Sequence, residues 1–197
     1  MLISKEGSHL LTIQFLCTLQ EEDDGVSFHF FGREYQLSWK NLSLLLGFHR
    51  KCIVDFDKAV RDFKCHSFWT SISGQVIVGK FYPCCNDIHN PTLRLMHKWL
   101  ALSLFPREDV RLVRNDELKI LYAMVKKIRV SPIKPMIAQW LEHFKMTGPI
   151  KCTSLITRIA SKVRALDGAP VPFIQTPHTI IDEAHLVQGH TLKHDAN

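Results

Sequence analysis

Near the N-terminus, the spacing of apolar residues changes from that of a helix to that of a strand. In VSFHFFGREYQL, at residues 26–37, apolar side chains alternate with polar ones, and Gly32-Arg33 offers a two-residue turn with glycine first. This predicts a β-hairpin at about 26–37, expected to be the only sheet. Elsewhere apolar residues recur every three or four positions, as in helices. The sequence therefore predicts a mainly α, multi-helix globular domain with one N-terminal β-hairpin.

Two helices are expected on either side of the hairpin. The segment SHLLTIQFLCTLQ, at 8–20, fits a helix that Ser8 caps and the acidic run 21–25 ends. After the hairpin, Ser38 can cap the short helix WKNLSLLLGF, which Gly47 stops. Shorter helical segments are expected near 55–64 and 68–74.

The segment HNPTLRLMHKWLALSLFPR, at 89–107, is apolar over most of a helical circumference. Its longest uninterrupted apolar run is seven or eight residues, whereas a membrane span needs about 20. The only polar stripe consists of Arg94, His97, Lys98 and Ala101. We therefore expect no membrane partner and a buried core helix, with His97 hydrogen-bonded at the edge of the core.

Three more helices follow before the periodic pattern ends. Asn115 is expected to cap the first, Pro135 to begin the second and Gly148-Pro149 to close it, and SLITRIASKVRAL, at 154–166, forms the third. Together these elements predict one helical domain over 1–166. Residues 167–197 contain three prolines and four histidines without a sustained period, which predicts a weakly ordered tail.

Positive charge is concentrated in one part of the chain. Residues 107–164 carry 13 basic and 5 acidic side chains, whereas residues 1–106 carry 11 and 10, and the remainder carries 1 and 4. A basic face of this kind could contact the phosphate backbone of RNA or DNA without reading its sequence. The alternative is a solvated helical surface that is rich in Lys and Arg. The candidate nucleic-acid-binding residues are Lys119, Lys126, Lys127, Arg129, Lys134, Arg158, Lys162 and Arg164.

No motif predicts a catalytic residue, a cofactor or a metal. GQVIVGKF, at 74–81, has the spacing of a phosphate-binding loop, but Phe81 stands where Ser or Thr must hold magnesium. Cys84, Cys85 and His89 supply at most half of a zinc site. The six cysteines and the absence of a secretory signal at the N-terminus predict reduced thiols and an intracellular location, in cytosol or nucleus.

Five segments of the chain, taken in order, have a recognisable combination of motifs. They are FLCTL at 15–19, VSFHFFGREYQLSWKNLSLLLGF at 26–48, FWTSISG at 68–74, IHNPTLRLMHKWLALSLFPRED at 88–109 and DELKILYAM at 116–124. In this order they resemble the domain that the first open reading frame of Athila-type plant retrotransposons encodes in the gag region. The resemblance covers about residues 10–165 and implies a non-enzymatic, gag-like protein of a flowering plant, or a degenerate fragment of one. It implies no catalytic residues.

Two other functions remain open from the sequence. The chain could be a host protein-interaction scaffold of the plant mobile-domain kind, with the apolar face of the hairpin as its contact surface. It could also be an enzyme with a Cys/His or metal site. Self-association is a further expectation that one sequence does not decide. Phosphate contacts weaken steeply with salt and apolar contacts do not, so salt dependence separates the first alternative from nucleic-acid binding.

Overall fold

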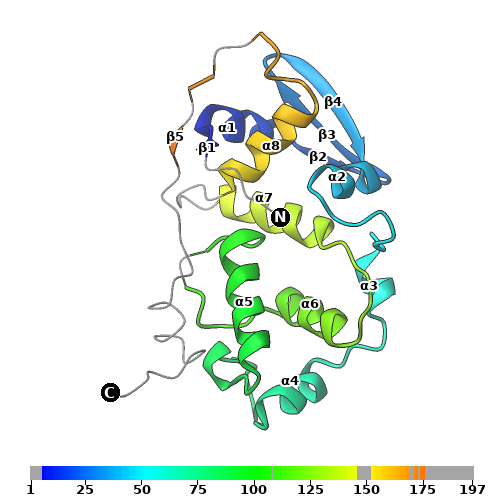
Figure 1. Cartoon of the computed structure of the whole chain (residues 1–197), viewed down its shortest axis with the longest axis vertical. Coiled ribbons are helices and arrows are strands. Elements are labelled where there is room, and N and C mark those ends of the chain that lie inside the picture. Colours follow the sequence, from blue (N-terminus) through cyan, green and yellow to red (C-terminus); the bar gives the residue numbers. More distant parts are fainter. Residues whose placement is uncertain (1–5, 108, 146–151, 169–170, 173, 176–197) are drawn as a thin grey trace. The chain divides into compact units, whose positions relative to one another are not determined.

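The computed structural model describes residues 6–107, 109–145, 152–168, 171–172 and 174–175. The chain divides into two compact units (Figure 1). Of the described residues, 6–56, 131–145, 152–168, 171–172 and 174–175 belong to the first unit, and 57–107 and 109–130 belong to the second. One domain over 1–166 stays a prediction, and most of the tail at 167–197 lies outside the described residues.

The first unit contains the predicted hairpin as part of a larger sheet. Strands β2 (Gln20–Glu22), β3 (Gly25–Phe30) and β4 (Arg33–Ser38) form an antiparallel meander in the order β2-β3-β4. The acidic run does not simply end the first helix, because its first residues form β2. All three β2 side chains are exposed. Strand β2 therefore lacks the alternation of apolar and polar residues by which a sequence predicts a strand.

The hairpin turn lies one residue earlier than predicted. Phe30 pairs with Arg33, so the turn residues are Phe31 and Gly32 rather than Gly32 and Arg33. Their φ angles are 51° and 75°, as a type I′ turn requires at both central positions. The register of β3 on β4 fixes this turn and places an aromatic residue in a backbone conformation that side chains rarely adopt.

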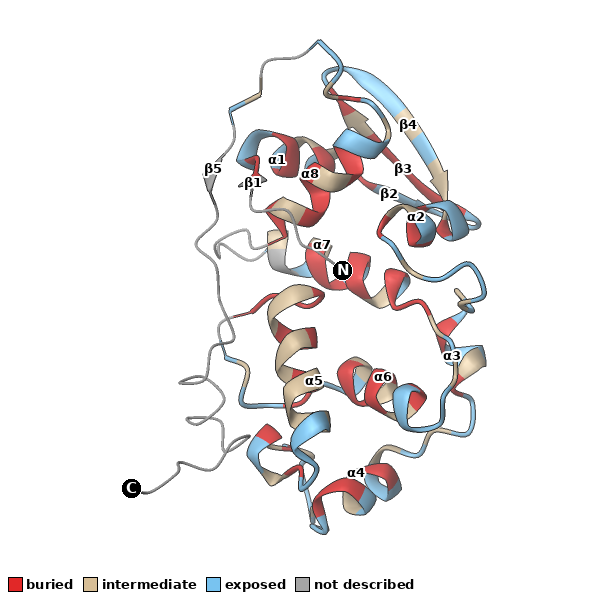
Figure 2. Ribbon diagram, in the orientation of Figure 1, coloured by how far each residue is buried: buried red, intermediate tan, exposed pale blue. Residues whose placement is uncertain are grey.

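The core of the first unit lies between α1 (His9–Thr18) and the inner face of β3 (Figure 2). The ring centroid of Phe15 is 4.7 Å from that of Phe28 and 6.0 Å from that of Phe30. Val26, Phe28 and Phe30 are each at most 1% exposed. The apolar face of the hairpin is therefore covered by α1 and is not available as the contact surface that the sequence suggested.

Helices α2 (Trp39–Leu45), α7 (Ile133–Lys145) and α8 (Thr153–Lys162) complete the helical part of this unit. Helix α2 packs on α7, and α1 packs on α8. The predicted caps Ser8 and Ser38 are confirmed, because their hydroxyl oxygens accept from the N–H groups of Leu11 and Asn41.

Chain segments far apart in the sequence meet beside the start of α1. Strand β1 (Glu6–Gly7) pairs with β5 (Ile174–Gln175), so the meander is not the only sheet. The N–H of Ser8 also donates to Thr157 Oγ1 at 2.9 Å. These contacts join the N-terminal part of the first unit to its C-terminal part.

The starts of the later helices differ slightly from the expectation. Helix α7 begins two residues before Pro135, and Arg114, not Asn115, is the N-cap of α6 (Asn115–Val125). Backbone hydrogen bonding decides such boundaries, and sequence patterns place them only within a few residues. The predicted helix end at Gly148-Pro149 lies outside the described residues.

The second unit packs α6 against α4 (Cys65–Ser73) and α5 (Pro91–Ser103). Short elements connect them: the helix predicted at 55–64 is the four-residue α3 (Phe56–Ala59), at the sequence boundary between the units, and η1 (Cys85–Asp87) precedes α5. Asn90 caps α5 by accepting from the N–H groups of Thr92 and Leu93.

The expected orientation of α5 is wrong. Two members of its predicted polar stripe, His97 and Ala101, are completely buried, whereas the apolar Leu93 and Met96 are only half-buried. The reason is a buried carboxylate on α6 that binds His97. None of the described helices is long and apolar enough to cross a membrane.

Replacement of Phe28 tests the packing between α1 and the sheet. We expect Phe28→Ala to lower the free energy of unfolding by about 3–5 kcal/mol, because the lost ring leaves a cavity against Phe15 and Phe30. The measurement is urea denaturation followed by circular dichroism. The control is Val78→Ala at a side chain that is 91% exposed, and equal stability loss in both variants would contradict this core.

Candidate nucleic-acid interface

The eight basic residues predicted to contact nucleic acid divide equally between the two units. Lys119, Lys126, Lys127 and Arg129 belong to the second unit. The first unit contains Lys134, Arg158, Lys162 and Arg164. They therefore form two separate groups of four, each with its own surroundings, and their contact with nucleic acid stays a prediction.

In the second unit, three of the cations follow one another at the end of α6. Lys126, Lys127 and Arg129 are all exposed, and we call them the α6-end cluster. They lie where α6 presents its last carbonyl groups, a position that stabilises positive charge. Lys127 has a φ of 56°, which ends the helix at this point. Three cations within four positions make a compact positive surface.

Lys119 differs from the other members of its group. Its ammonium lies 2.6 Å from Asp57 Oδ1 and 3.7 Å from Asp116 Oδ1, and its side chain is 19% exposed. Two carboxylates compete with any phosphate for this ammonium. Lys119 is thus the least suited of the four to bind nucleic acid. Its ion pair connects Asp57, in α3, to α6.

An aromatic cluster borders the α6-end cluster. The Lys126 ammonium lies 6.0 Å from the ring centroid of Tyr122, and the Tyr122 ring lies 5.4 Å from Phe63 and 5.3 Å from Phe68. Tyr122 and Phe63 are half-buried. Sequence patterns do not predict this aromatic cluster, because Phe63 and Tyr122 are far apart along the chain and meet only through packing.

The first-unit candidates are more dispersed. Lys134, on the first turn of α7, holds its ammonium 5.3 Å from the ring centroid of Trp39. Arg158, on α8, lies over Gly47, whose missing Cβ would stand 3.3 Å from the Arg158 Nη2 atom. Lys162 and Arg164 are exposed around the end of α8.

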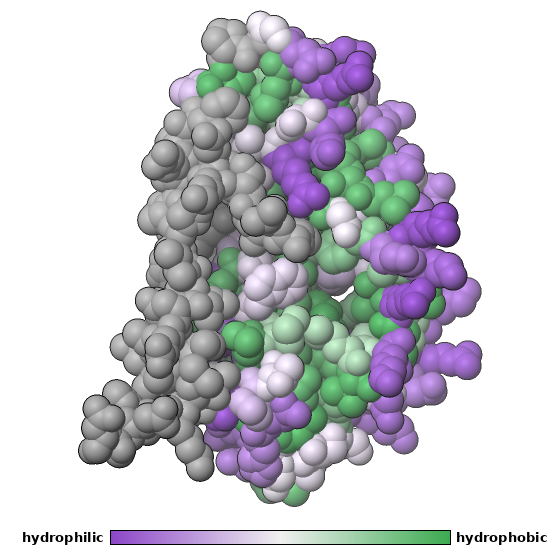
Figure 3. All heavy atoms as spheres, in the orientation of Figure 1, coloured by the Kyte–Doolittle hydropathy of each residue, from purple (hydrophilic) through white to green (hydrophobic). Residues whose placement is uncertain are grey.

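Three basic residues that were not predicted join Lys134 around α2. The Lys40 ammonium donates to the carbonyl oxygens of Arg50 and Cys52 and so fastens the loop after α2, where Arg50 and Lys51 remain exposed. Hydrophilic residues gather over β4, α2 and this loop, at the right of the view in Figure 3. We call Lys40, Arg50, Lys51 and Lys134 the α2 cluster. The run His49-Arg50-Lys51 was the sequence signal for it.

Acidic residues lie beside the α2 cluster. The N–H of Trp39 donates to the Asp24 carbonyl oxygen at 3.0 Å, which holds the acidic turn at the start of α2. Residues 1–56 and 131–178, which make up the first unit, carry 11 basic and 9 acidic side chains, a net charge of +2, whereas residues 57–130 carry 13 and 7, a net charge of +6. The continuous segment 57–130 of the second unit is therefore more positive than the first unit.

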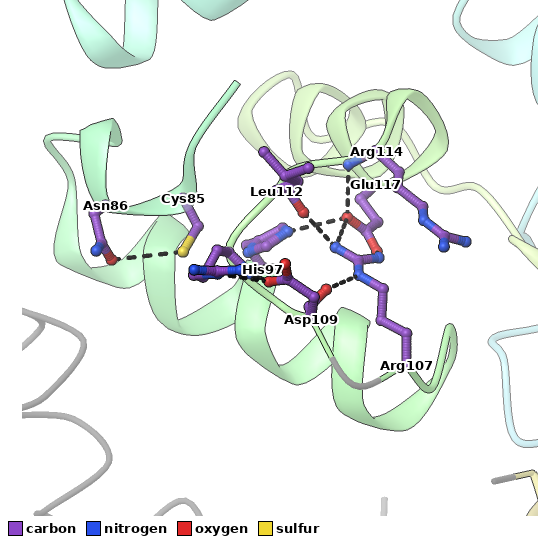
Figure 4. A network of polar contacts seen from close by, with 9 residues as sticks. Cys85, Asn86, His97, Arg107, Asp109, Leu112, Arg114 and Glu117 are labelled. Carbon is purple, nitrogen blue, oxygen red and sulfur yellow. Dashed lines mark hydrogen bonds and ion pairs between the residues drawn. The ribbon is translucent and has the colours of Figure 1, made fainter. Parts of the chain in front are cut away.

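The second unit contains a buried polar network that is centred on Glu117 (Figure 4). The Glu117 carboxylate, which is 1% exposed, lies 3.0 Å from His97 Nε2 and accepts from both terminal nitrogens of Arg107. It also accepts from the N–H of Arg114 at 2.9 Å. Burial favours a raised pKa for Glu117, but the hydrogen bonds from His97 and Arg107 outweigh it and hold the pKa below its ordinary value.

This network joins parts of the second unit and is closed to solvent. Arg107 also donates to the carbonyl oxygens of Asp109 and Leu112, so it fixes the loop between α5 and α6. His97 is 0% exposed and lies inside the unit, deeper than the core edge where it was expected. Its hydrogen bond to Glu117 agrees with the expectation that His97 is hydrogen-bonded. The paired and buried side chains of the network stabilise the unit.

The remaining sequence candidates do not assemble into a site. Gly74 has a φ of 68° and ends helix α4, so a helix and not a strand precedes the segment that had the spacing of a phosphate loop. Among the described residues, no three His, Cys, Asp or Glu side chains gather as metal ligands would. The six thiols are free, and burial raises the pKa of Cys152 to about 12.

Comparison with models of known protein families gives a match over a large part of the chain. The model of the ATHILA ORF-1 family matches residues 1–130. This range contains α1 to α6 and the meander, and it covers about two thirds of the chain. No curated protein and no solved structure matches the chain.

Replacement of Glu117 tests the buried network. Glu117→Gln leaves Arg107 buried without its counter-charge, and we expect the free energy of unfolding at pH 7 to fall by about 3–5 kcal/mol. A carboxylate whose pKa is lowered by folding stabilises the protein above its unfolded pKa of about 4.3. That contribution is lost as the pH falls through the folded pKa.

The difference in the free energy of unfolding between wild type and Glu117→Gln should therefore become smaller below about pH 4. Urea denaturation at a series of pH values measures it. Glu34→Gln, at an exposed position, is the control and should change stability by less than about 0.5 kcal/mol. A difference that stays constant down to about pH 2 would show that the Glu117 charge does not stabilise the unit.

Proposed function

We propose that this chain, which belongs to the ATHILA ORF-1 family, is a non-enzymatic, gag-like retrotransposon protein that binds the phosphate backbone of RNA or DNA. The observation that carries the proposal is the α6-end cluster, three exposed cations at Lys126, Lys127 and Arg129 in a segment with a net charge of +6. Family membership supports the retrotransposon origin.

Contacts of this kind position nucleic acid without reading bases. Lys and Arg on a helix end neutralise phosphates and release counterions, so affinity falls with salt in proportion to the number of contacts. For three contacts on duplex DNA, a rise from about 50 to 200 mM salt is expected to weaken binding about 40-fold. The half-buried rings of Tyr122 and Phe63 stand beside the cluster, and stacking on single-stranded bases would add to the affinity for RNA.

The first unit would contribute a second and weaker surface. Lys134 belongs to the α2 cluster, and Arg158, Lys162 and Arg164 lie on or just after α8. The acidic turn held at Trp39 repels phosphate from the same end of α2. We therefore assign the larger share of the affinity to the second unit.

The second candidate function is a host protein-interaction scaffold. Its supporting observation is a set of exposed apolar side chains on α1 and the hairpin turn, among them Leu10, Ile13 and Phe31. Binding through these residues would persist at high salt, whereas phosphate contact would not.

Charge reversal at the α6-end cluster tests the phosphate contact. We expect Lys126→Glu with Lys127→Glu to weaken binding of labelled single-stranded RNA and duplex DNA by 10-fold or more at about 50 mM salt, and to flatten the salt dependence. Fluorescence anisotropy of the full chain measures both. The matched control, Lys80→Glu with Lys145→Glu, makes the same charge change at exposed positions outside the candidate set.

Each result has a defined meaning. Loss of binding in the cluster variant alone locates the contact at the end of α6. Equal loss in both variants would show that only net charge matters, and no binding by wild type at about 50 mM salt would make the cluster a solvated surface.

A further inference from the structure

The irregular segment between α4 and η1 carries the two most exposed large apolar side chains among the described residues. Val78 is 91% exposed and Val76 is 74% exposed, whereas no other large apolar side chain in that part of the chain exceeds 54%. We call residues 75–82, QVIVGKFY, the α4–η1 segment. It contains most of the stretch that has the spacing of a phosphate loop without its Ser or Thr. The proposed phosphate contact does not use it, so its exposure needs another explanation.

The backbone of the α4–η1 segment is free to bind another chain. Among the described residues, no backbone N–H or C=O group of 76–82 forms a hydrogen bond, and 75–78 belong to no helix, strand or turn. Gly79 has a φ of 87°, and no atom lies within 4 Å of where its Cβ would stand. A partner can therefore draw the segment into an extended strand and add main-chain hydrogen bonds without breaking a hydrogen bond of the fold.

Both ends of the α4–η1 segment are fastened to the second unit. At its start, the Gly74 N–H donates to the Thr70 carbonyl oxygen at 2.8 Å, and the Thr70 hydroxyl donates to the Gln75 carbonyl oxygen at 3.1 Å. Just after its end, the Val113 N–H donates to the Pro83 carbonyl oxygen at 2.9 Å. The helices on either side, α4 and α5, both pack against α6. A break in the middle of the segment would thus leave both new ends attached to the unit.

We propose that the α4–η1 segment is a cleavage site for an endopeptidase that holds its substrate as an extended strand and prefers an aliphatic residue on the amine side of the bond. The bond is Ile77–Val78, because Val78 presents the most exposed aliphatic side chain to a pocket of the enzyme. Hydrolysis breaks the C–N bond, and one water supplies the hydroxyl group of the new Ile77 carboxyl and the hydrogen of the new Val78 amine. The two products remain associated.

The size of the α4–η1 segment favours an enzyme that binds briefly over a stable partner. A specific, stable interface buries about 1,200 Å² or more. The exposed apolar side chains of the segment are only Val76, Val78 and Tyr82, and three side chains do not supply that area. Exposed segments with an unpaired backbone are, in contrast, the usual sites of proteolytic nicking. The segment therefore meets the requirement of an endopeptidase and not that of a docking partner.

Limited proteolysis of the full chain by thermolysin, an endopeptidase that cuts on the amine side of aliphatic residues, tests the site. Intact-mass spectrometry identifies the products, and size-exclusion chromatography shows whether they stay together. Within residues 6–145, we expect Ile77–Val78 to be the first bond cut and the two products to elute together, as the uncut chain does. A first cut elsewhere in this range, or separation of the products, overturns the proposal.

Two substitutions show whether the enzyme recognises Val78. Val78→Asp removes the aliphatic side chain at an exposed position, so it should slow this cut about 10-fold or more and leave the urea midpoint of unfolding unchanged. The matched control is Ile53→Asp at a side chain that is 45% exposed and outside the helices and strands. The Ile53 carbonyl oxygen accepts from the Ser131 N–H. The control should be cut at Ile77–Val78 at the wild-type rate, and equal rates in the two variants would contradict the assignment of the bond.

A third variant shows whether the folded chain is the substrate. Glu117→Gln weakens the second unit, so bonds inside α6, which are cut only after unfolding, should be cut about 100-fold faster. The rate at Ile77–Val78 should change less than about 2-fold, because the segment is accessible in the folded unit. A parallel acceleration at Ile77–Val78 would show that cleavage requires unfolding and would overturn the proposal. The α6-end cluster lies outside the segment, so this result and the phosphate contact can fail separately.

Discussion

The buried carboxylate of Glu117 is the interaction on which the second unit depends. A charge in the interior is tolerated only when it is paired and hydrogen-bonded, and here His97, Arg107 and the N–H of Arg114 all meet it. These groups come from α5, from the loop after it and from the start of α6. Arg107 then holds two carbonyl groups of that loop. One ion thus orients the helix pair and the irregular segment between them.

The same network separates two uses of positive charge in this unit. Arg107 is buried and acts inside the fold, whereas Lys126, Lys127 and Arg129 are exposed where α6 ends. Arg107 neutralises the interior carboxylate, and the net positive charge of residues 57–130 remains on surface side chains. The first unit differs in both respects. Its core is aromatic and apolar, and the negative charge of its acidic turn offsets the positive charge of nearby Lys and Arg. The two units therefore offer different surfaces to a partner.

Local patterns in the sequence were sufficient for some of these features and not for others. The caps Ser8 and Ser38 and the apolar side of the hairpin at Phe28 and Phe30 depend on neighbours within a few residues, and the sequence predicts them. The turn and the register of the hairpin differ from the prediction by one residue. Strand β2 was missed because its side chains are all exposed. The full burial of His97 does not follow from local patterns, because its partner Glu117 is 20 positions away. The basic region was found from composition, but its division between two units depends on long-range packing, which periodicity does not report.

The discontinuity of the first unit has a consequence for synthesis on the ribosome. Its N–H to hydroxyl contact from Ser8 to Thr157 spans 149 positions, and α7 and α8 are the last of its helices to emerge. Residues 57–130 of the second unit form one uninterrupted segment and have their partners available much earlier. In the nascent chain, residues 57–130 should therefore fold while the apolar sides of α1 and the meander are still exposed. A holdase chaperone would bind these exposed apolar sides.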